Sequence, residues 1–233
     1  MHDQRIVTPP KPHRFVFYVL GMKILLLNKL RYALRGYREA RPFAPTEYQK
    51  AIEYDRRVVD NWLDALREYN GQSVEGKTVL ELGPGADLGP ALFLLDRSAK
   101  DYVTVDANRL IDQTPPIFYE QLLGTLAHGS ALKTELDKTL SGNGERIRYL
   151  VDPSSAFPKI KPDSIDLVVS QAAFEHFSDV ETVIAQLQPI VKSGATLIAE
   201  VDLMTHTGVL RSRDPLNIYR YSDAFYNRMR FSG

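Results

Sequence analysis

Acidic residues and glycines recur at positions where buried strands would end. A short apolar run reaches Glu81 and is followed by a tight turn containing Gly83 and Gly85. Glycines let a backbone approach a ligand closely, and the next helix presents unpaired N–H groups at its start. Asp106 follows the turn by about twenty residues, the spacing at which a carboxylate can accept hydrogen bonds from both hydroxyls of a ribose. The pattern predicts a nucleotide-type site.

Later strand ends carry further polar groups. Asp152 follows the third predicted strand and can accept a hydrogen bond from an exocyclic amino group, while the segment from Ser170 to His176 follows the fourth and would face the ligand. Each position also has a structural interpretation. Asp152 could cap a turn, Glu81 could be a buried acid paired with a backbone N–H, and His176 or His206 could be structural histidines.

Strand and helix patterns alternate from residue 77 onward. The expected strands are 77–82, 102–106, 146–151, 165–170 and 195–201, and the expected helices are 88–97, 117–126, 131–140 and 180–191. Residues 192–194 are predicted to form a turn. This alternation predicts a Rossmann-like α/β fold, with a doubly wound, mainly parallel sheet, helices on both faces and ligands at the carboxyl ends of the strands.

The first 70 residues differ from the rest and are predicted to form an N-terminal helical extension, with the main domain over 71–233. Residues 1–13 are expected to be a loose arm and 41–45 a linker. Thr46 is expected to cap a second helix, with Gln49 completing a capping box, and Asn70-Gly71 to end it.

The first predicted helix runs from Arg14 to about Arg35 and is apolar and basic. Residues 1–50 hold ten Lys and Arg against three Asp and Glu. The apolar part would be about 24 Å long, too short for the roughly 30 Å hydrocarbon core of a bilayer. It would either pack on the domain or on a partner subunit, or contact an anionic membrane surface through residues 14–38.

Composition narrows the function classes. The 233 residues carry no net charge, which argues against a nucleic-acid-binding domain. The chain has no cysteine, which excludes disulfides and thiolate metal sites and fits a reducing compartment such as the cytoplasm. Its five histidines lack metal-binding spacing, so no metal site is predicted.

Several segments together resemble a known family. They are residues 79–85, 105–106, 151–152, 165–176 and 187–195. Together they resemble class I S-adenosylmethionine-dependent methyltransferases, and in particular the methyltransferase type 11 group. The resemblance covers about residues 74–203. The segment that ends in Glu175-His176 and the Leu-x-Pro-x-x-Lys-x-Gly run before the fifth strand are more specific than the glycine turn.

The resemblance implies S-adenosylmethionine as the cofactor. It places Glu81, Gly83 and Gly85 along the methionine part, with Glu81 near the ammonium group, and Ser170 and Gln171 behind that part.

The same resemblance implies roles for residues after the second and third strands. Asp106 would hold the ribose hydroxyls, and Asp152 would meet the adenine amino group. Ala107 and Ser154 would lie close by.

Two features depart from the family pattern. Asp87 replaces the usual third glycine of the turn, where it would alter the cradle or cap the helix. About thirty residues follow the fifth strand, and 217–230 look helical, so the usual closing strand pair is expected to be missing. We interpret the chain as a truncated natural protein, a fragment or a reduced variant.

The expected reaction is in-line methyl transfer to a small molecule, a sugar or a lipid-linked glycan. His176, Glu175 and His206 are the candidate bases for a hydroxyl acceptor. Residues 202–206 and 215–223 would wall the acceptor pocket, where Arg220 and Tyr221 would bind a polar or anionic group.

Other functions remain open. An inactive methyltransferase-like scaffold could dock through the N-terminal helices. A nicotinamide-dependent oxidoreductase fits less well, because Leu88 occupies the third glycine position of GxGxxG. An aminopropyl transferase would need a paired-acid signature that the sequence does not show. The expected partners are the acceptor and a second copy of the chain.

Overall fold

The computed structural model describes residues 14–36, 43–153, 157, 159–177 and 179–229. The predicted arm over 1–13, residues 41–42 of the predicted linker and Ser154 lie outside these residues. The chain forms two compact units. One contains residues 39–201, and the other combines residues 1–38 with 202–233. The predicted division at residue 70 stays a prediction, although the helix before that residue belongs to the same unit as the sheet.

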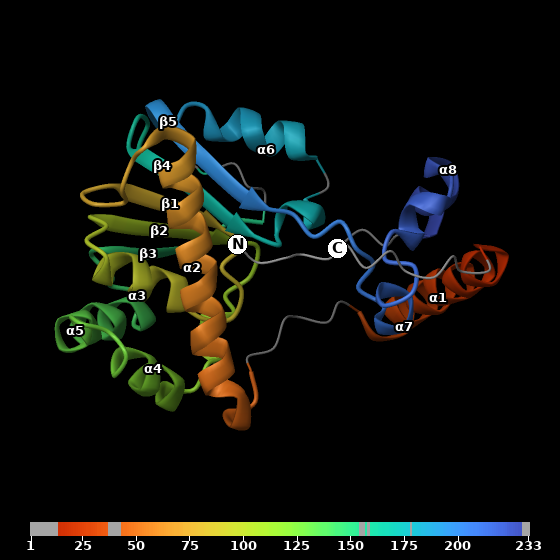
Figure 1. Cartoon of the computed structure of the whole chain (residues 1–233), viewed down its shortest axis with the longest axis horizontal. Helices are drawn as coiled ribbons and strands as arrows, with labels where there is room; N and C mark the ends of the chain where they lie inside the picture. Colours follow the sequence, from red (N-terminus) through yellow and green to blue (C-terminus); the bar gives the residue numbers. More distant parts are fainter. Residues whose placement is uncertain (1–13, 37–42, 154–156, 158, 178, 230–233) are drawn as a thin grey trace. The chain divides into compact units, whose positions relative to one another are not determined.

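The larger unit is built on a five-stranded parallel sheet (Figure 1). Its strands are β1 (Thr78–Leu82), β2 (Asp101–Asp106), β3 (Ile147–Val151), β4 (Ile165–Gln171) and β5 (Val191–Glu200). They lie in the order β3-β2-β1-β4-β5, and all four pairings are parallel. The order reverses between β1 and β4, which makes their carboxyl ends the topological switch point. The predicted Rossmann-like fold is confirmed.

Helices cover both faces of this sheet (Figure 1). They are α2 (Tyr48–Asn70), α3 (Gly89–Asp96), α4 (Pro116–Leu123), α5 (Gly129–Leu140) and α6 (Val180–Leu187). The first four share one buried apolar cluster with the face of the sheet that carries Val79 and Tyr102. Helix α6 packs on the other face, where its Val183 and Leu187 meet Leu80 and Val168.

Helix α2 forms because apolar side chains recur at helical spacing. Ile52, Val59, Trp62 and Leu66 are all buried on one stripe that faces α3 and the sheet. The helix ends at Gly71, as predicted: this glycine has φ 69° and donates its N–H to the Arg67 carbonyl at 2.8 Å.

The predicted capping box of α2 is wrong. Residues Pro45–Glu47 form a 3₁₀ turn, and α2 begins after them at Tyr48. Neither Thr46 nor Gln49 therefore occupies the position that a capping box requires, and no side chain caps the α2 N-terminus.

The fifth strand begins earlier than the sequence predicts. Residues 192–194 form part of β5 rather than a turn, and α6 ends at Leu187 rather than near residue 191. The pairing of β4 with β5 shifts register between Ile165 and Leu167, and Gly194 adopts φ 80°. Glycine in the left-handed region accommodates such a bulge without ending the strand.

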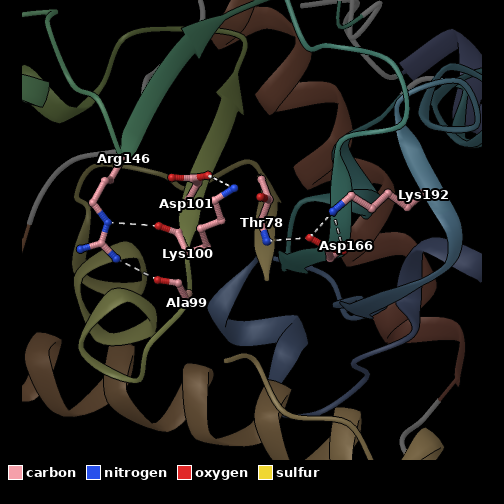
Figure 2. A network of polar contacts seen from close by, with 7 residues as sticks. All are labelled: Thr78, Ala99, Lys100, Asp101, Arg146, Asp166 and Lys192. Atoms are coloured by element: carbon pink, nitrogen blue, oxygen red, sulfur yellow. Dashed lines mark hydrogen bonds and ion pairs between the residues drawn. The ribbon is translucent and has the colours of Figure 1, made fainter. Parts of the chain in front are cut away.

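Polar contacts join the amino ends of the strands (Figure 2). Asp166 of β4 accepts hydrogen bonds from the Thr78 N–H at 2.9 Å and from Lys192 Nζ at 2.8 Å. Arg146 donates to two carbonyls that precede β2, at 3.1 and 2.9 Å. These contacts tie the strands together at the edge of the sheet opposite the glycine turn.

The smaller unit pairs the first helix with the C-terminal segment. It contains α1 (Arg14–Arg35), α7 (Gly208–Arg211), a 3₁₀ turn at Asn217–Arg220 and α8 (Asp223–Met229). A Cβ placed on Gly21 would lie 2.0 Å from Asn217 Oδ1, and Asn217 donates to the Phe17 carbonyl at 3.0 Å. The absence of a side chain at Gly21 therefore lets α1 meet this segment.

The helix predicted over 217–230 is broken. Tyr221 is extended between the 3₁₀ turn and α8, and its hydroxyl donates to the Tyr18 carbonyl of α1 at 2.9 Å. Arg220 binds Asp214 through two hydrogen bonds of 2.8 and 2.6 Å. Both side chains thus serve contacts within this unit. Among the described residues, no helix is both long and apolar enough to cross a membrane.

Candidate functional site

The turn after β1 is held in place from two sides. Gly83 has φ 72° and donates its N–H to the Val105 carbonyl of β2 at 2.9 Å. Thr114 donates its hydroxyl to the Ala86 carbonyl at 2.6 Å. Gly85 also has a left-handed backbone, with φ 75°. The two glycines therefore give the turn a conformation that other residues adopt at a cost.

Gly83 and Gly85 differ in the space around them. A Cβ on Gly83 would lie 2.5 Å from the Ala173 Cβ, whereas a Cβ on Gly85 would meet no described atom within 4 Å. Ala172, just after β4, itself has φ 50° and donates its N–H to the Glu200 carbonyl at 2.8 Å. Gly83 thus admits the segment after β4, while Gly85 leaves its backbone open to a ligand.

Asp106 connects the end of β2 to the glycine turn. Its carboxylate accepts a hydrogen bond from the Asn108 N–H at 3.1 Å and also from the N–H groups of Gly85 and Ala107. Burial raises the pKa of Asp106, and these three N–H groups act in the opposite direction. The predicted ribose-binding residue and the predicted glycine cradle are therefore in contact.

Glu81 is buried near the end of β1 and accepts a hydrogen bond from the Tyr102 hydroxyl. Burial raises its pKa to about 8, an effect that the Tyr102 hydrogen bond opposes and that the nearby Asp87 and Asp106 reinforce. In the absence of a cation, this carboxyl is therefore mostly protonated at neutral pH.

The free energy of unfolding of the ligand-free protein should fall as the pH rises from about 4.5 to about 8. A carboxyl whose pKa is raised by folding stabilises fully below its unfolded pKa, and this contribution is lost as the pH rises through the folded pKa. Glu81→Gln should reduce the slope, leaving the part that comes from Asp55 and Asp87. Urea unfolding of both proteins across this pH range measures how the free energy of unfolding depends on pH. If Glu81→Gln showed the same dependence as the wild type, the raised pKa of Glu81 would be contradicted.

Residues at the ends of β3 and β4 make structural contacts. Asp152 donates its N–H to the Asp106 carbonyl and accepts the Phe157 N–H on Oδ2, both at 2.9 Å. Ser170 donates its hydroxyl to the Leu82 carbonyl at 3.0 Å. These contacts explain the positions of Asp152 and Ser170 without a ligand. Their cofactor roles remain predictions.

The three candidate bases do not come from one unit. Glu175 and His176 lie in the 3₁₀ turn Phe174–His176 directly after β4. His206 belongs to the other unit, where its Nε2 lies 3.7 Å from an Asp202 carboxylate oxygen. The larger unit therefore supplies only the adjacent pair from its own strand ends.

An apolar hollow of about 600 Å³ lies between α6 and β5. Val180, Ile184 and Leu197 are among its lining residues. It includes neither the glycine turn nor Asp106, so the site described above does not depend on it.

Helix α2 contributes residues that the motif analysis missed. Tyr54 makes a side-chain hydrogen bond with Gln171, and Asp55 lies beside Asp87 of the turn. A signal for Asp55 was present, because it occupies the buried stripe of α2 between Ile52 and Val59. A carboxylate on an apolar helix face is unusual unless it has a partner.

Comparison with known protein families gives a match within the larger unit. Residues 124–199 match the family model of a methyltransferase domain. The match covers about a third of the chain. Together with the glycine turn, the sheet order and the motifs at the strand ends, it supports a class I S-adenosylmethionine-dependent methyltransferase, a class that takes S-adenosylmethionine as its cofactor. No curated protein sequence matches the chain.

Solved structures similar to this chain include several methyltransferases. An S-adenosylmethionine-dependent methyltransferase from Aquifex aeolicus is 17% identical, with a TM-score of 0.42 over 68% of this chain and 72% of that chain. One from Mesorhizobium loti is 19% identical, with a TM-score of 0.39 over 62% and 55%. Phosphoethanolamine N-methyltransferase 1 from Haemonchus contortus, in complex with phosphoethanolamine and S-adenosylhomocysteine, is 14% identical, with a TM-score of 0.42 over 79% and 33%.

The residues around the glycine turn fit S-adenosylmethionine. Gly85 leaves open space beside a left-handed turn, and Asp106 offers a carboxylate next to it. Asp55 Oδ2 is buried and has no hydrogen-bond partner among the described residues. A cationic nucleoside can use all three of these features: an open backbone, a carboxylate for its hydroxyl groups and an unsatisfied carboxylate oxygen for its positive charge.

Proposed function

We propose that this methyltransferase acts on a small molecule, a sugar or a lipid-linked glycan. The methyltransferase part of this proposal rests on the contact between Asp106 and Gly85 at the switch point of the sheet. It joins a carboxylate that would bind the ribose to an open glycine backbone. The chain is also electrically neutral overall, which suits a small acceptor better than a nucleic acid.

The cofactor-binding assignments follow the strand ends. Asp106 would accept hydrogen bonds from the ribose hydroxyls, with Ala107 beside it, and Asp152 would meet the adenine amino group. Ser170 and Gln171 would lie behind the methionine part, where Ser170 already fixes the end of β1 against β4. These roles use the same edge of the sheet.

The methionine side would be lined by Glu81, Gly83 and Gly85. Protonated Glu81 would lose its proton when a positive group arrives, because a nearby cation favours the charged carboxylate. Cofactor binding would therefore add one negative charge to the site, opposite the positive group of the ligand.

The chemistry depends mainly on position. When bound, S-adenosylmethionine supplies a methyl group on a sulfonium, and its departing thioether is neutral. The protein's residues hold the acceptor in line and exclude water. Glu175 or His176 would take the proton from a hydroxyl acceptor, and His206 is the third candidate.

Calorimetric titration with S-adenosylmethionine, followed by turnover on a panel of small hydroxyl and glycan acceptors, tests this function. We expect micromolar cofactor binding and S-adenosylhomocysteine formation with one acceptor class. Cofactor binding without turnover on any acceptor would favour the scaffold alternative. The oxidoreductase alternative requires nicotinamide cofactor binding in the same titration.

We also propose that α1 brings the enzyme to an anionic membrane surface. Besides Tyr18, six large apolar side chains of α1 are exposed: Phe15, Val16, Leu26, Leu27, Leu30 and Leu34. At 3.6 residues per turn they lie on one side of the helix, away from the Gly21 side that packs within the unit. Lys23 lies among them, Arg31 borders them, and α1 contains no acidic residue. Such a helix suits an interfacial position and a membrane-proximal acceptor in a cytoplasmic enzyme.

Sedimentation with lipid vesicles measures this contact. Binding to phosphatidylcholine vesicles that contain phosphatidylglycerol should be about thirtyfold tighter than to phosphatidylcholine alone, because Lys23 and Arg31 each contribute about 1 kcal/mol near an anionic surface. Leu30→Glu should abolish it. Val209→Glu, an exposed position in α7 of the same unit, is the matched control. Equal binding to both lipids, or a dimer without lipid binding, would contradict the proposal.

A further inference from the structure

Asp55 brings a carboxyl group from α2 to the glycine turn. Only 4% of this residue is exposed, and its Oδ2 has no hydrogen-bond partner among the described residues. A Cβ placed on Gly89, the first residue of α3, would lie 2.0 Å from that oxygen. The glycine therefore allows an unusually close approach of the Asp55 carboxyl to the start of α3.

Two more carboxyl groups lie next to Asp55. Asp87 makes a side-chain hydrogen bond with it and accepts the Gly89 N–H on Oδ1 at 2.8 Å. Glu81 contributes a third carboxyl from the end of β1. None of the three forms an ion pair with a residue that the structure describes. Burial raises the pKa of Asp55 to about 10 and that of Asp87 to about 6, with their mutual repulsion adding to the Asp55 shift.

An unsatisfied polar atom on β2 faces the same region. Thr104 is fully buried, and its Oγ1 has no hydrogen-bond partner among the described residues. Thr104 pairs in register with Glu81, so the two side chains lie on the same face of the sheet. A buried polar atom without a partner destabilises the folded state. Unsatisfied oxygens from α2 and β2 therefore lie on the face of the sheet that also carries the Glu81 carboxyl group.

We propose that Asp55 binds the ammonium group of the methionine part of S-adenosylmethionine, together with Asp87 at the end of the glycine turn. The inference rests on the proposed cofactor function and extends it to a residue outside the strand-end motifs. A primary ammonium carries one positive charge and donates three hydrogen bonds, which matches several buried oxygen acceptors. When it binds, Asp55 releases its proton to solvent and becomes the charged partner.

The proposal gives α2 a direct part in cofactor binding. Asp55 lies one residue beyond Tyr54, whose side chain makes a hydrogen bond with Gln171 at the end of β4. Helix α2 would therefore contribute Asp55 to the ammonium group and place Tyr54 next to Gln171, which we assign to the same methionine part. Removal of the Asp55 charge should weaken only ligands that carry the amino group.

The test compares two ligands in calorimetric titrations of the full chain. One is S-adenosylhomocysteine, and the other is 5′-S-(3-carboxypropyl)-5′-thioadenosine, which lacks only the amino group. Asp55→Asn should bind S-adenosylhomocysteine about 10- to 100-fold more weakly, as expected for loss of a charge-assisted hydrogen bond, and the second ligand unchanged. Asp64→Asn, on the exposed side of the same helix, should bind both like the wild type.

Proton release provides a second measurement. In buffers of different ionisation enthalpy, the wild type should release about one more proton than Asp55→Asn when it binds S-adenosylhomocysteine, because Glu81 can lose its proton in both proteins. Equal proton release, unchanged affinity in Asp55→Asn, or an equal loss for both ligands would overturn the proposal. Failure of the wild type to bind either ligand would instead remove the cofactor function itself.

Discussion

Replacement of Asp106 by alanine is expected to weaken binding of S-adenosylmethionine at least a hundredfold. A carboxylate at this position would accept two charge-assisted hydrogen bonds from a ribose, and each contributes about 1.5–3 kcal/mol. Loss of the side chain also leaves the Gly85, Ala107 and Asn108 N–H groups without this acceptor, which loosens the turn. Calorimetric titration with S-adenosylmethionine and S-adenosylhomocysteine measures the effect directly.

Two further variants make this experiment specific. Asp101→Ala lies at the opposite end of the same strand, where its carboxylate is 3.9 Å from Lys100 Nζ, and it should bind the cofactor like the wild type. Asp106→Asn keeps one acceptor oxygen and should fall between the wild type and Asp106→Ala. Unchanged cofactor binding by a folded Asp106→Ala variant would remove the assignment of this site.

The sequence predicted the sheet well because its strands are apolar runs with clear limits. β2 and β4 start or end within one residue of their predicted bounds, because charged and polar residues mark both sides of each run. The error at β5 came from Gly194, whose type indicates a turn as readily as a bulge. Whether Gly194 forms a turn or a bulge depends on the pairing of β5 with β4, and this pairing cannot be inferred from the local sequence.

The candidate site was predictable where it follows strand ends and less so where it comes from another helix. Glu81, Asp106 and Asp152 could be placed on one edge of the sheet from topology alone. Asp55 could not, because its distance from Asp87 depends on how α2 packs across α3. The signal was a carboxylate on the apolar face of α2. The helical periodicity shows that this position is buried, but it does not show which residue of another element lies beside it.

Alanine at Gly83 and alanine at Gly85 should damage the protein in different ways. Both glycines have left-handed backbones, so each substitution costs about 1–2 kcal/mol of strain. At Gly83 the new Cβ would also meet Ala173 at 2.5 Å, and such overpacking adds about 1–3 kcal/mol. Urea unfolding should therefore show a loss of about 2–5 kcal/mol for Gly83→Ala and only the strain for Gly85→Ala.

For cofactor affinity we expect the opposite order: among folded molecules, Gly85→Ala should bind the cofactor more weakly than Gly83→Ala. The Cβ of Gly85→Ala would project into open space beside Asp106, where we place the cofactor, and should weaken S-adenosylmethionine binding at least tenfold in a protein that remains folded. Gly208→Ala, at a glycine of the other unit with no atom near its added Cβ, should change neither property. If Gly85→Ala bound the cofactor normally, the space beside this glycine would not be the cofactor site, and its left-handed backbone would serve only to shape the turn that begins at Gly83.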